Sequence, residues 1–336
     1  MSAGSGERGF SRMRHWMTPV AFLALIAAVV MPEVTLPRDT FSYIVTFDIT
    51  QSMDVEDVGL NGAPVSRLKF AQAAMRDALG QLPCGSKVGW SVFTGQRTLL
   101  LLSPVEVCSN YDALLVSLDG IDGRMRWTNW SRIAEGGVYS AVRVAQDVGH
   151  GAAIVFVTDG QEAPPVLPSR ALMRDINPAR IKGWLIGVGG DQPVAIPKTD
   201  ANGNRIGYWR AEDVIQVPPT PGSAAPVVTH EELSELRGQY LESVAGQTGL
   251  AYRRLVSTSS LGEAMLDARF AHREPVRTDL RWCPALFALL LLVVRFMPDV
   301  VWRWQGWQWW RGSPQARRGS MKSQVMAASA RQSQSR

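Results

Sequence analysis

Two segments of this 336-residue chain close a strand-like apolar run with an aspartate, and hydroxyl side chains follow the first of them. Thr50 and Ser52 stand two and four residues after Asp48, and Asp159 ends the run of residues 153–159. Carboxylate and hydroxyl oxygens are hard ligands, whereas zinc prefers nitrogen and sulfur. The pattern therefore favours a divalent-cation site, first of all for Mg²⁺, with Ca²⁺ or Mn²⁺ as alternatives.

A third segment is needed, because a hard cation takes about six oxygen ligands. The loop before a predicted helix at residues 132–148 offers a further hydroxyl, from Ser131 or Thr128. Water and a carboxylate from a partner protein would supply the rest. Trp127 and Trp130 flank this loop, and they are either core residues or, if exposed, anchors for a partner.

Apolar strands alternate with amphipathic helices from about residue 40 to residue 272. This alternation is typical of an α/β fold with a doubly wound, mostly parallel sheet covered on both faces. A hairpin at residues 88–104 adds an antiparallel edge strand. Because ligands bind where parallel strands end, both aspartates are expected at one edge of the sheet. The predicted strands are 41–48, 88–94, 98–104, 153–160, 181–188 and 251–256, and the predicted helices are 66–82, 111–118, 132–148, 168–175, 231–245 and 261–270.

The chain has three cysteines, and two of them flank the predicted hairpin. Cys84 stands before its first strand and Cys108 after its second, so the open ends of the hairpin bring them together. In an oxidising compartment they would form a disulfide, and otherwise they are two reduced, half-buried thiols.

The D-x-T-x-S motif at residues 48–52 and the T-D-G motif at residues 158–160 resemble the metal-ion-dependent adhesion site of von Willebrand factor A (VWA) domains. That family usually has Ser where Thr50 stands, and its loop hydroxyl is usually Thr. Ser131 fits the family's loop pattern better than Thr128, which stays the second candidate. Read alone, residues 48–52 would be explained better as a helix cap cluster than as a metal site. The resemblance implies a metal site formed by Asp48, Thr50, Ser52, Ser131 and Asp159, some of them through water.

Within the VWA family, the sequence around the first motif and around Cys84 is similar to that of two bacterial groups. They are the methanol-dehydrogenase accessory (MxaL-like) proteins and the Bat-type VWA proteins associated with MoxR ATPases. The resemblance implies a role in the assembly or metal insertion of a periplasmic oxidoreductase such as methanol dehydrogenase. It also implies other VWA proteins or a MoxR-type ATPase complex as partners.

The net charge of +5 is unevenly distributed along the chain. Without the thirteen basic and three acidic residues of its ends, residues 33–275 carry 22 Lys and Arg against 27 Asp and Glu. Proteins that bind nucleic acids normally carry positive charge on their folded domain, so a nucleic-acid partner is not expected.

Both ends combine an apolar run with basic residues, and the second run precedes a cluster of tryptophans. This is typical of bacterial inner-membrane proteins, and the positive-inside rule places residues 35–275 in the periplasm. The first run is alternatively a cleaved signal peptide, and the second a buried core helix. The predicted organisation is a basic cytoplasmic leader (1–15), a transmembrane anchor or signal sequence (16–34), a VWA domain (40–272) with an insertion at about 191–229, a transmembrane helix (282–302) and a basic cytoplasmic tail (303–336).

No catalytic motif stands out beside the predicted ion: the four histidines fall in no motif, and there is no nucleophile elbow, phosphate loop or zinc spacing. The sequence thus predicts a non-enzymatic binding module, whose ion receives a carboxylate from a protein partner. Two alternatives stay open, a structural member of a membrane complex with a purely structural ion and a metal-dependent hydrolase.

Overall fold

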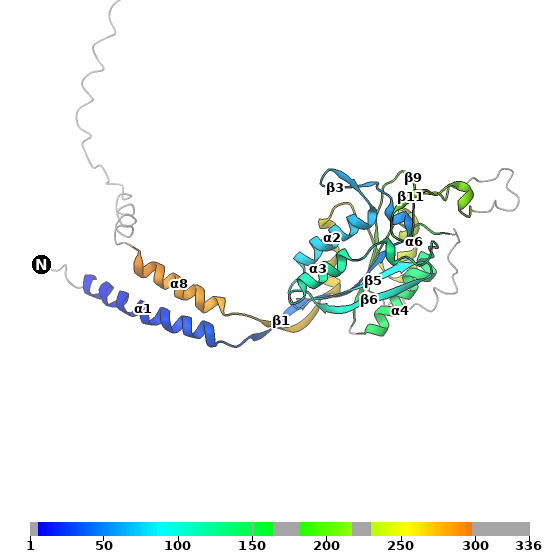
Figure 1. The fold of residues 1–336 in the computed structure, drawn as a ribbon. Helices are drawn as coiled ribbons and strands as arrows, with labels where there is room; N and C mark the ends of the chain where they lie inside the picture. Colours follow the sequence, from blue (N-terminus) through cyan, green and yellow to red (C-terminus); the bar gives the residue numbers. More distant parts are fainter. Residues whose placement is uncertain (1–5, 150, 164–181, 217–229, 298–336) are drawn as a thin grey trace, which may run out of the picture. The chain divides into compact units, whose positions relative to one another are not determined.

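The computed structural model describes residues 6–149, 151–163, 182–216 and 230–297 (Figure 1). The chain divides into a helical unit, formed by residues 1–34 and 279–336, and an α/β unit, formed by residues 35–278. The predicted helix 168–175, part of the insertion and the tail 303–336 lie outside the described residues.

The helical unit contains α1 (Gly6–Val30) and α8 (Trp282–Phe296), which lie side by side (Figure 1). In α8 there are 15 residues, whereas a membrane-spanning helix needs about 20. The longer α1 carries several arginines in its first turns. Within the described ranges, no helix is both long enough and apolar enough to cross a membrane. The transmembrane helices predicted at 16–34 and 282–302 are therefore not supported.

The α/β unit is organised around a six-stranded sheet with the strand order β13-β8-β7-β2-β5-β6. All neighbouring strands run parallel except β6, which pairs antiparallel with β5 at the edge. The mostly parallel sheet with an antiparallel edge strand is thus confirmed. The strands are β2 (Ser42–Asp48), β5 (Lys87–Thr94), β6 (Arg97–Glu106), β7 (Ala153–Thr158), β8 (Gly183–Gly187) and β13 (Ala251–Arg254).

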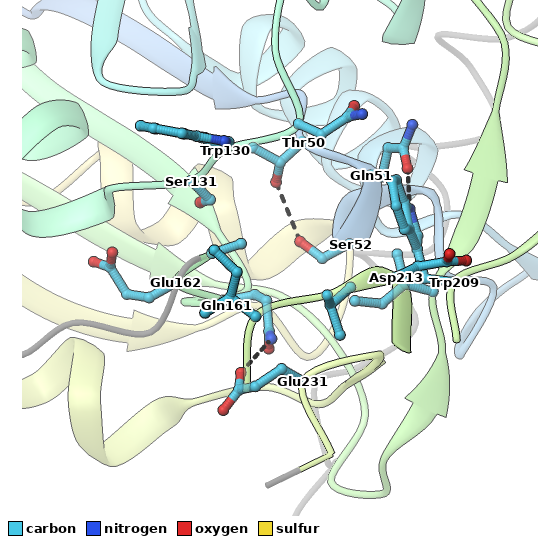
Figure 2. A pocket seen from close by; sticks show the side chains of 15 residues that line it. Thr50, Gln51, Ser52, Trp130, Ser131, Gln161, Glu162, Trp209, Asp213 and Glu231 are labelled. Atoms are coloured by element: carbon cyan, nitrogen blue, oxygen red, sulfur yellow. Dashed lines mark hydrogen bonds between the residues drawn. The ribbon is translucent and has the colours of Figure 1, made fainter. Parts of the chain in front are cut away.

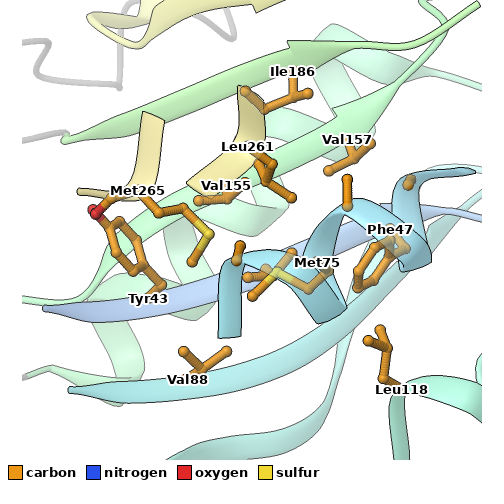
Figure 3. Packing of buried hydrophobic residues seen from close by; sticks show 14 of the residues in the cluster. Tyr43, Phe47, Met75, Val88, Leu118, Val155, Val157, Ile186, Leu261 and Met265 are labelled. Carbon is orange, nitrogen blue, oxygen red and sulfur yellow. The ribbon is translucent and has the colours of Figure 1, made fainter. Parts of the chain in front are cut away.

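Helices cover both faces of the sheet because side chains alternate along each buried strand. In β2, Tyr43 and Phe47 pack into one apolar layer, and Ile44 packs into the other. Figure 3 shows the first layer, where Met75 and Leu261 come from helices and Val155 from β7. The first layer contains α2 (Arg67–Gln81), α3 (Tyr111–Asp119) and α7 (Ser259–Met265), and the second contains a π-helical turn (η3, Ile133–Val138), α4 (Tyr139–Val148) and α6 (Gly238–Thr248).

The helix predicted at 132–148 differs from expectation at its start. The N–H groups of Gly136 and Gly137 both donate to the carbonyl of Arg132, which opens a wide π-helical turn before α4. A Cβ on Gly136 would lie 2.7 Å from the backbone of Gln96, so only glycine permits this close packing. Such turns are frequent at functional sites, and this one directly follows Ser131.

The described part of the insertion forms short antiparallel pairs beside the end of β2. Gln51 donates from Nε2 to the carbonyl of Thr199 at 3.4 Å, and Trp209 donates from Nε1 to Oε1 of Gln51. The insertion therefore contacts the first predicted metal-binding loop. The helix predicted at 231–245 begins only at Gly238, because β12 precedes it. The pairs are β10 (Pro197–Thr199) with β11 (Arg205–Tyr208) and β12 (Leu233–Ser234) with β9 (Val194–Ala195).

Smaller elements complete the α/β unit. They are the strand pairs β1 (Val34–Thr40) with β14 (His272–Thr278) and β3 (Val58–Leu60) with β4 (Ala63–Val65), and the short 3-10 helices η1 (Gln51–Asp54), η2 (Gly123–Met125), η5 (Ala211–Asp213) and η6 (Ala268–Phe270).

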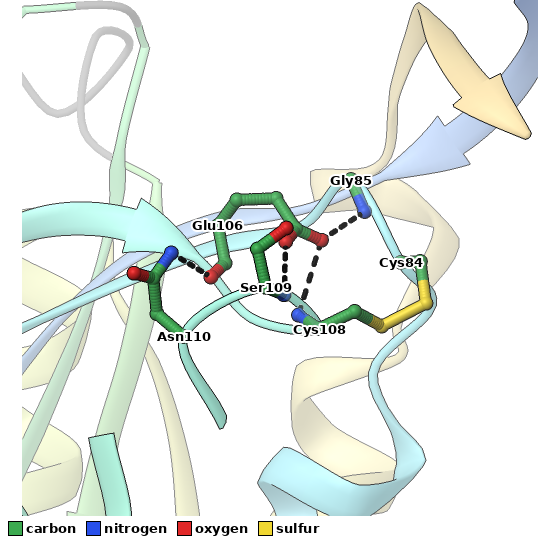
Figure 4. The surroundings of a disulfide bond; sticks show 6 residues. All are labelled: Cys84, Gly85, Glu106, Cys108, Ser109 and Asn110. Carbon is green, nitrogen blue, oxygen red and sulfur yellow. Dashed lines mark hydrogen bonds between the residues drawn. A yellow bond between two sulfur atoms is a disulfide. The ribbon is translucent and has the colours of Figure 1, made fainter. Parts of the chain in front are cut away.

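Cys84 and Cys108 are joined in a disulfide at the open end of the hairpin (Figure 4). The Glu106 carboxylate accepts from the backbone N–H of Gly85 at 2.7 Å, of Cys108 at 3.1 Å and of Ser109 at 2.6 Å. Burial raises the pKa of Glu106, but these N–H donors lower it overall. The ionised side chain thus holds both cysteine loops in place.

We predict that reduction of this disulfide lowers the free energy of unfolding by about 3 kcal/mol, the chain-entropy value for a loop of 24 residues. Urea denaturation with and without dithiothreitol measures the effect. A Cys283→Ser variant, which removes a free exposed thiol, should respond as the wild type does. The explanation is wrong if a Cys84→Ser/Cys108→Ser protein still loses stability in reductant.

Candidate functional site

Asp48 is fully buried at the carboxyl end of β2, and three hydroxyl-bearing residues surround it. Its Oδ1 accepts from the backbone N of Thr50 at 2.9 Å and from the Thr50 hydroxyl at 2.7 Å. Its Oδ2 accepts from the hydroxyl of Thr158 at 2.7 Å. The Thr50 hydroxyl lies 3.1 Å from that of Ser52. The structure therefore brings the three residues of the first motif together, and adds Thr158, which belongs to the T-D-G motif but was not among the predicted ligands.

Ser131 lines one pocket with residues of the first motif (Figure 2), whereas Asp48, Thr158 and Thr128 do not line it. The pocket has a volume of about 320 Å³, and Thr50 and Ser52 line it as well. Two backbone hydrogen bonds with Ala163, at 2.7 and 2.8 Å, fix Ser131 in place. The residue is 2% exposed, and its Oγ has no hydrogen-bond partner among the residues that the structure describes. A buried hydroxyl without a partner carries a free-energy cost, which a ligand in the pocket would relieve.

Asp159 lies at the same edge of the sheet, but an arginine holds it. The fully buried Arg67 places Nη1 2.6 Å from Asp159 Oδ2, and the other carboxylate oxygen accepts from the backbone N of Gln161 at 2.9 Å. Ser234 donates its hydroxyl to Asp159 Oδ2 at 3.1 Å. Asp159 does not line the pocket that Ser131 lines. Gly160, with φ of 84°, makes the turn that follows it.

Arg67 also pairs with a second carboxylate, that of Asp57. Its Nε and Nη2 donate to the two oxygens of Asp57 at 2.9 and 2.6 Å, in a bidentate pair. Burial alone would raise the pKa of Asp57, but the hydrogen bonds and charge of Arg67 lower it. Arg67 was not predicted as a functional residue, although its spacing in the sequence indicates that it is buried. Helical spacing puts Arg67 on one stripe with the buried alanines Ala71, Ala74 and Ala78.

Asp48 has no arginine partner in the described ranges. Burial raises its pKa to about 7, with the negative charge of Asp159 as the second cause, and the hydrogen bonds from Thr158 and Thr50 only partly offset them. A buried carboxylate of this kind favours either a proton or a cation beside it. Asp48 is therefore the one member of the aspartate pair whose charge the protein leaves uncompensated.

Arg126 forms hydrogen bonds that hold the loop after Asp48 in place. It donates from Nε to the carbonyl of Ile49 at 2.6 Å and from Nη1 to the hydroxyl of Thr199 at 2.9 Å. Its Nη2 pairs with Asp54 at 2.9 Å. The loop that carries Thr50 and Ser52 is thus tied to the insertion.

The oxygen donors of the pocket fit a hard divalent cation. Three hydroxyls line it, with the carboxylate of Asp48 directly behind Thr50. Within the described chain, one group of three or more His, Cys, Asp or Glu side chains lies close enough to hold an ion, and it contains the disulfide-bonded Cys84 and Cys108. Bonded cysteines offer no thiolate ligand. The residues that would hold the ion are Asp48, Thr50, Ser52 and Ser131.

The two tryptophans beside the loop are both exposed. Trp127 is 49% and Trp130 is 53% exposed, so neither is a core residue. Only Trp130 lines the pocket. Of these two, Trp130 is therefore the one placed to contact a ligand in the pocket.

No protein-family model matches the sequence, and no curated protein matches it significantly. The chain is similar in structure to an aerotolerance-related membrane protein from Bacteroides fragilis, with 19% identity, 66% of this chain and 95% of that chain covered, and a TM-score of 0.46. It is similar to the conserved hypothetical protein BatB from Bacteroides thetaiotaomicron (20%, 66% and 94%, TM-score 0.46). A von Willebrand factor type A structure from Catenulispora acidiphila is a further match (12%, 76% and 46%, TM-score 0.39). These TM-scores lie below 0.5, so the interpretation of the site depends on its own geometry.

We predict that Arg67→Met lowers the free energy of unfolding by about 3–5 kcal/mol, because it leaves Asp57 and Asp159 buried without their cation. The matched control is Arg76→Met in the same helix. Arg76 pairs with Asp119 on the exposed surface, so its loss should cost less than about 1 kcal/mol. Urea denaturation of both variants measures the difference, and equal losses would contradict the role given to Arg67.

Proposed function

We propose that this protein is a VWA-type binding module that holds a divalent cation, Mg²⁺ first of all, and uses it to capture a carboxylate of a protein partner. The observation that carries the proposal is the buried hydroxyl of Ser131. It has no hydrogen-bond partner within the described part of the chain, and it lines one pocket with the hydroxyls of Thr50 and Ser52, close to Asp48.

The charge balance of the donor set supports capture of a carboxylate. Three of the four proposed ligands are neutral hydroxyls, so Asp48 is the one ligand whose charge would oppose the two charges of the ion. Asp159 adds little, because Arg67 pairs with it. An ion held this way keeps positive charge toward the pocket, and a carboxylate entering from a partner would complete its shell. The exposed ring of Trp130 would pack against the same partner.

The proposal also includes the cellular compartment of the module. A disulfide such as Cys84–Cys108 is typical of oxidising compartments, which supports the periplasmic location predicted from the sequence. The resemblance to MxaL-like and Bat-type proteins gives the narrower hypothesis, a role in assembling a periplasmic oxidoreductase at the inner membrane.

Calorimetric titration of the metal-free protein with MgCl₂ or MnCl₂ tests the site. We expect one ion per chain in the wild type and at least about tenfold weaker binding in Ser131→Ala, since even outer-shell substitutions weaken metal sites by that factor. Thr128→Ala is the matched control, because that hydroxyl stands three residues away and does not line the pocket. Equal weakening in both variants, or no uptake by the wild type, would contradict the proposed site.

The pH dependence of stability tests the environment of Asp48. Its folded pKa, about 7, lies above its unfolded value of about 4, so its stabilising contribution is complete below pH 4 and is lost as the pH rises through 7. In EDTA, the free energy of unfolding of the wild type should therefore fall between pH 5 and pH 7.5 relative to Asp48→Asn. Saturating Mg²⁺ should reduce this fall, because the ion replaces the proton. Parallel pH curves in EDTA would show that Asp48 does not titrate as described.

A further inference from the structure

The pocket extends beyond the three hydroxyls toward the insertion. Trp130 forms one side, and Trp209, Ile196 and Ile215 line it from the insertion (Figure 2). A volume of about 320 Å³ is more than a single ion and its waters require, and it matches the lower range of organic ligand sites. The pocket therefore has room for a side chain next to the ion.

Gln161 supplies a second buried polar atom without a partner. The residue is 2% exposed, and no described residue forms a hydrogen bond with its Oε1. Its Nε2 donates to Glu231 Oε2 at 3.1 Å, and Arg237 donates to the same oxygen at 2.8 Å. A carboxylate accepts hydrogen bonds, so the NH₂ group of the amide must face Glu231. Oε1 is thus fixed as a carbonyl acceptor, which an N–H or O–H donor of a ligand would satisfy, as would a cation.

The charge of the pocket selects among such donors. The described lining residues include three carboxylates and no Lys, Arg or His. Arg237 pairs with Glu231, and Lys198 lies 3.6 Å from Asp213. Glu162 is 6% exposed, and its Oε1 accepts from two neutral donors, the hydroxyl of Tyr240 at 2.6 Å and the backbone N–H of Ala134 at 3.2 Å. A positively charged N–H donor therefore fits the space beside Gln161 and Glu162 better than a neutral one does.

We propose that this part of the pocket binds a basic side chain of the partner, which donates to Gln161 Oε1 and faces Glu162. The acidic residue that binds the ion would belong to the same segment, so the ligand is a peptide with one basic and one acidic residue close together. The proposal rests on the proposed function for the acidic half alone. The basic half depends on Gln161, Glu162 and the exposed ring of Trp130, over which a cation can stack.

Four blocked hexapeptides of Gly and Ser test the proposal: one with Arg and Glu, one with Glu alone, one with Arg alone and one with neither. Each is titrated into the full-length protein in Mg²⁺ and in EDTA, with calorimetry as the readout. In Mg²⁺, the peptide with both charges should bind at least tenfold more tightly than the peptide with Glu alone. A Lys version and the reversed order of the two charges show which cation and spacing fit best.

Two variants assign the effect to the pocket. Gln161→Met keeps the length of the side chain but removes the acceptor, and Glu162→Gln keeps the shape but removes the charge. Both should lose the advantage of Arg while binding the Glu peptide as before. Unchanged Mg²⁺ affinity in both variants is the control for folding.

The outcomes separate the two proposals. An Arg peptide that binds in EDTA and depends on Gln161 supports the basic subsite even if Glu peptides show no Mg²⁺-dependent binding, which would sink only the proposed function. The inference is overturned if Arg adds nothing in the wild type in either buffer, or if its advantage persists in Gln161→Met.

Discussion

The rest of the site depends on how the negative charges of two buried aspartates, at one edge of the sheet, are compensated. The parallel pairing of β2 with β7 brings Asp48 and Asp159 to the same edge, where the charge of Asp159 helps to raise the pKa of Asp48. Burial of like charges is costly unless cations or protons compensate them. The chain compensates one aspartate with its own arginine, Arg67, and leaves the other, Asp48, among hydroxyl groups. The difference between the two environments is what makes a cation site physically reasonable at Asp48.

The surrounding elements keep this arrangement in place. Arg67 begins α2 and connects Asp57, Asp159 and Ser234, so it ties the helix, the end of β7 and the return from the insertion together. Arg126 links the loop after Asp48 to the insertion. The wide π-helical turn after Ser131 orients the third loop. Because the loops are fixed by charged contacts within the protein, the pocket is formed before any ligand arrives, which lowers the entropic cost of binding.

The sheet could be predicted from the sequence because its buried strands are continuous apolar runs and its helices show clear periodicity. Ser131 and Thr128 were distinguishable only through the loop pattern, and the structure places the first in the pocket and leaves the second outside it. Arg67 was not predicted, because an arginine at a helix start usually lies on the surface, and its partners are 10, 92 and 167 residues away in the chain. Gln161 and Glu162 were missed for the same reason: their importance comes from contacts with Glu231 and Tyr240 rather than from any motif.

The account makes one central claim, that hydroxyl groups from two separate loops hold a single hard ion beside Asp48. Anomalous diffraction from crystals grown with MnCl₂ tests it most directly, because manganese can be located without reference to the surrounding protein. The account predicts one strong anomalous peak in the pocket, within about 2.3 Å of the Ser131 hydroxyl and of Thr50 or Ser52. A fully occupied crystal with no peak there, or with its ion bound to Asp159 in place of Arg67, would contradict it.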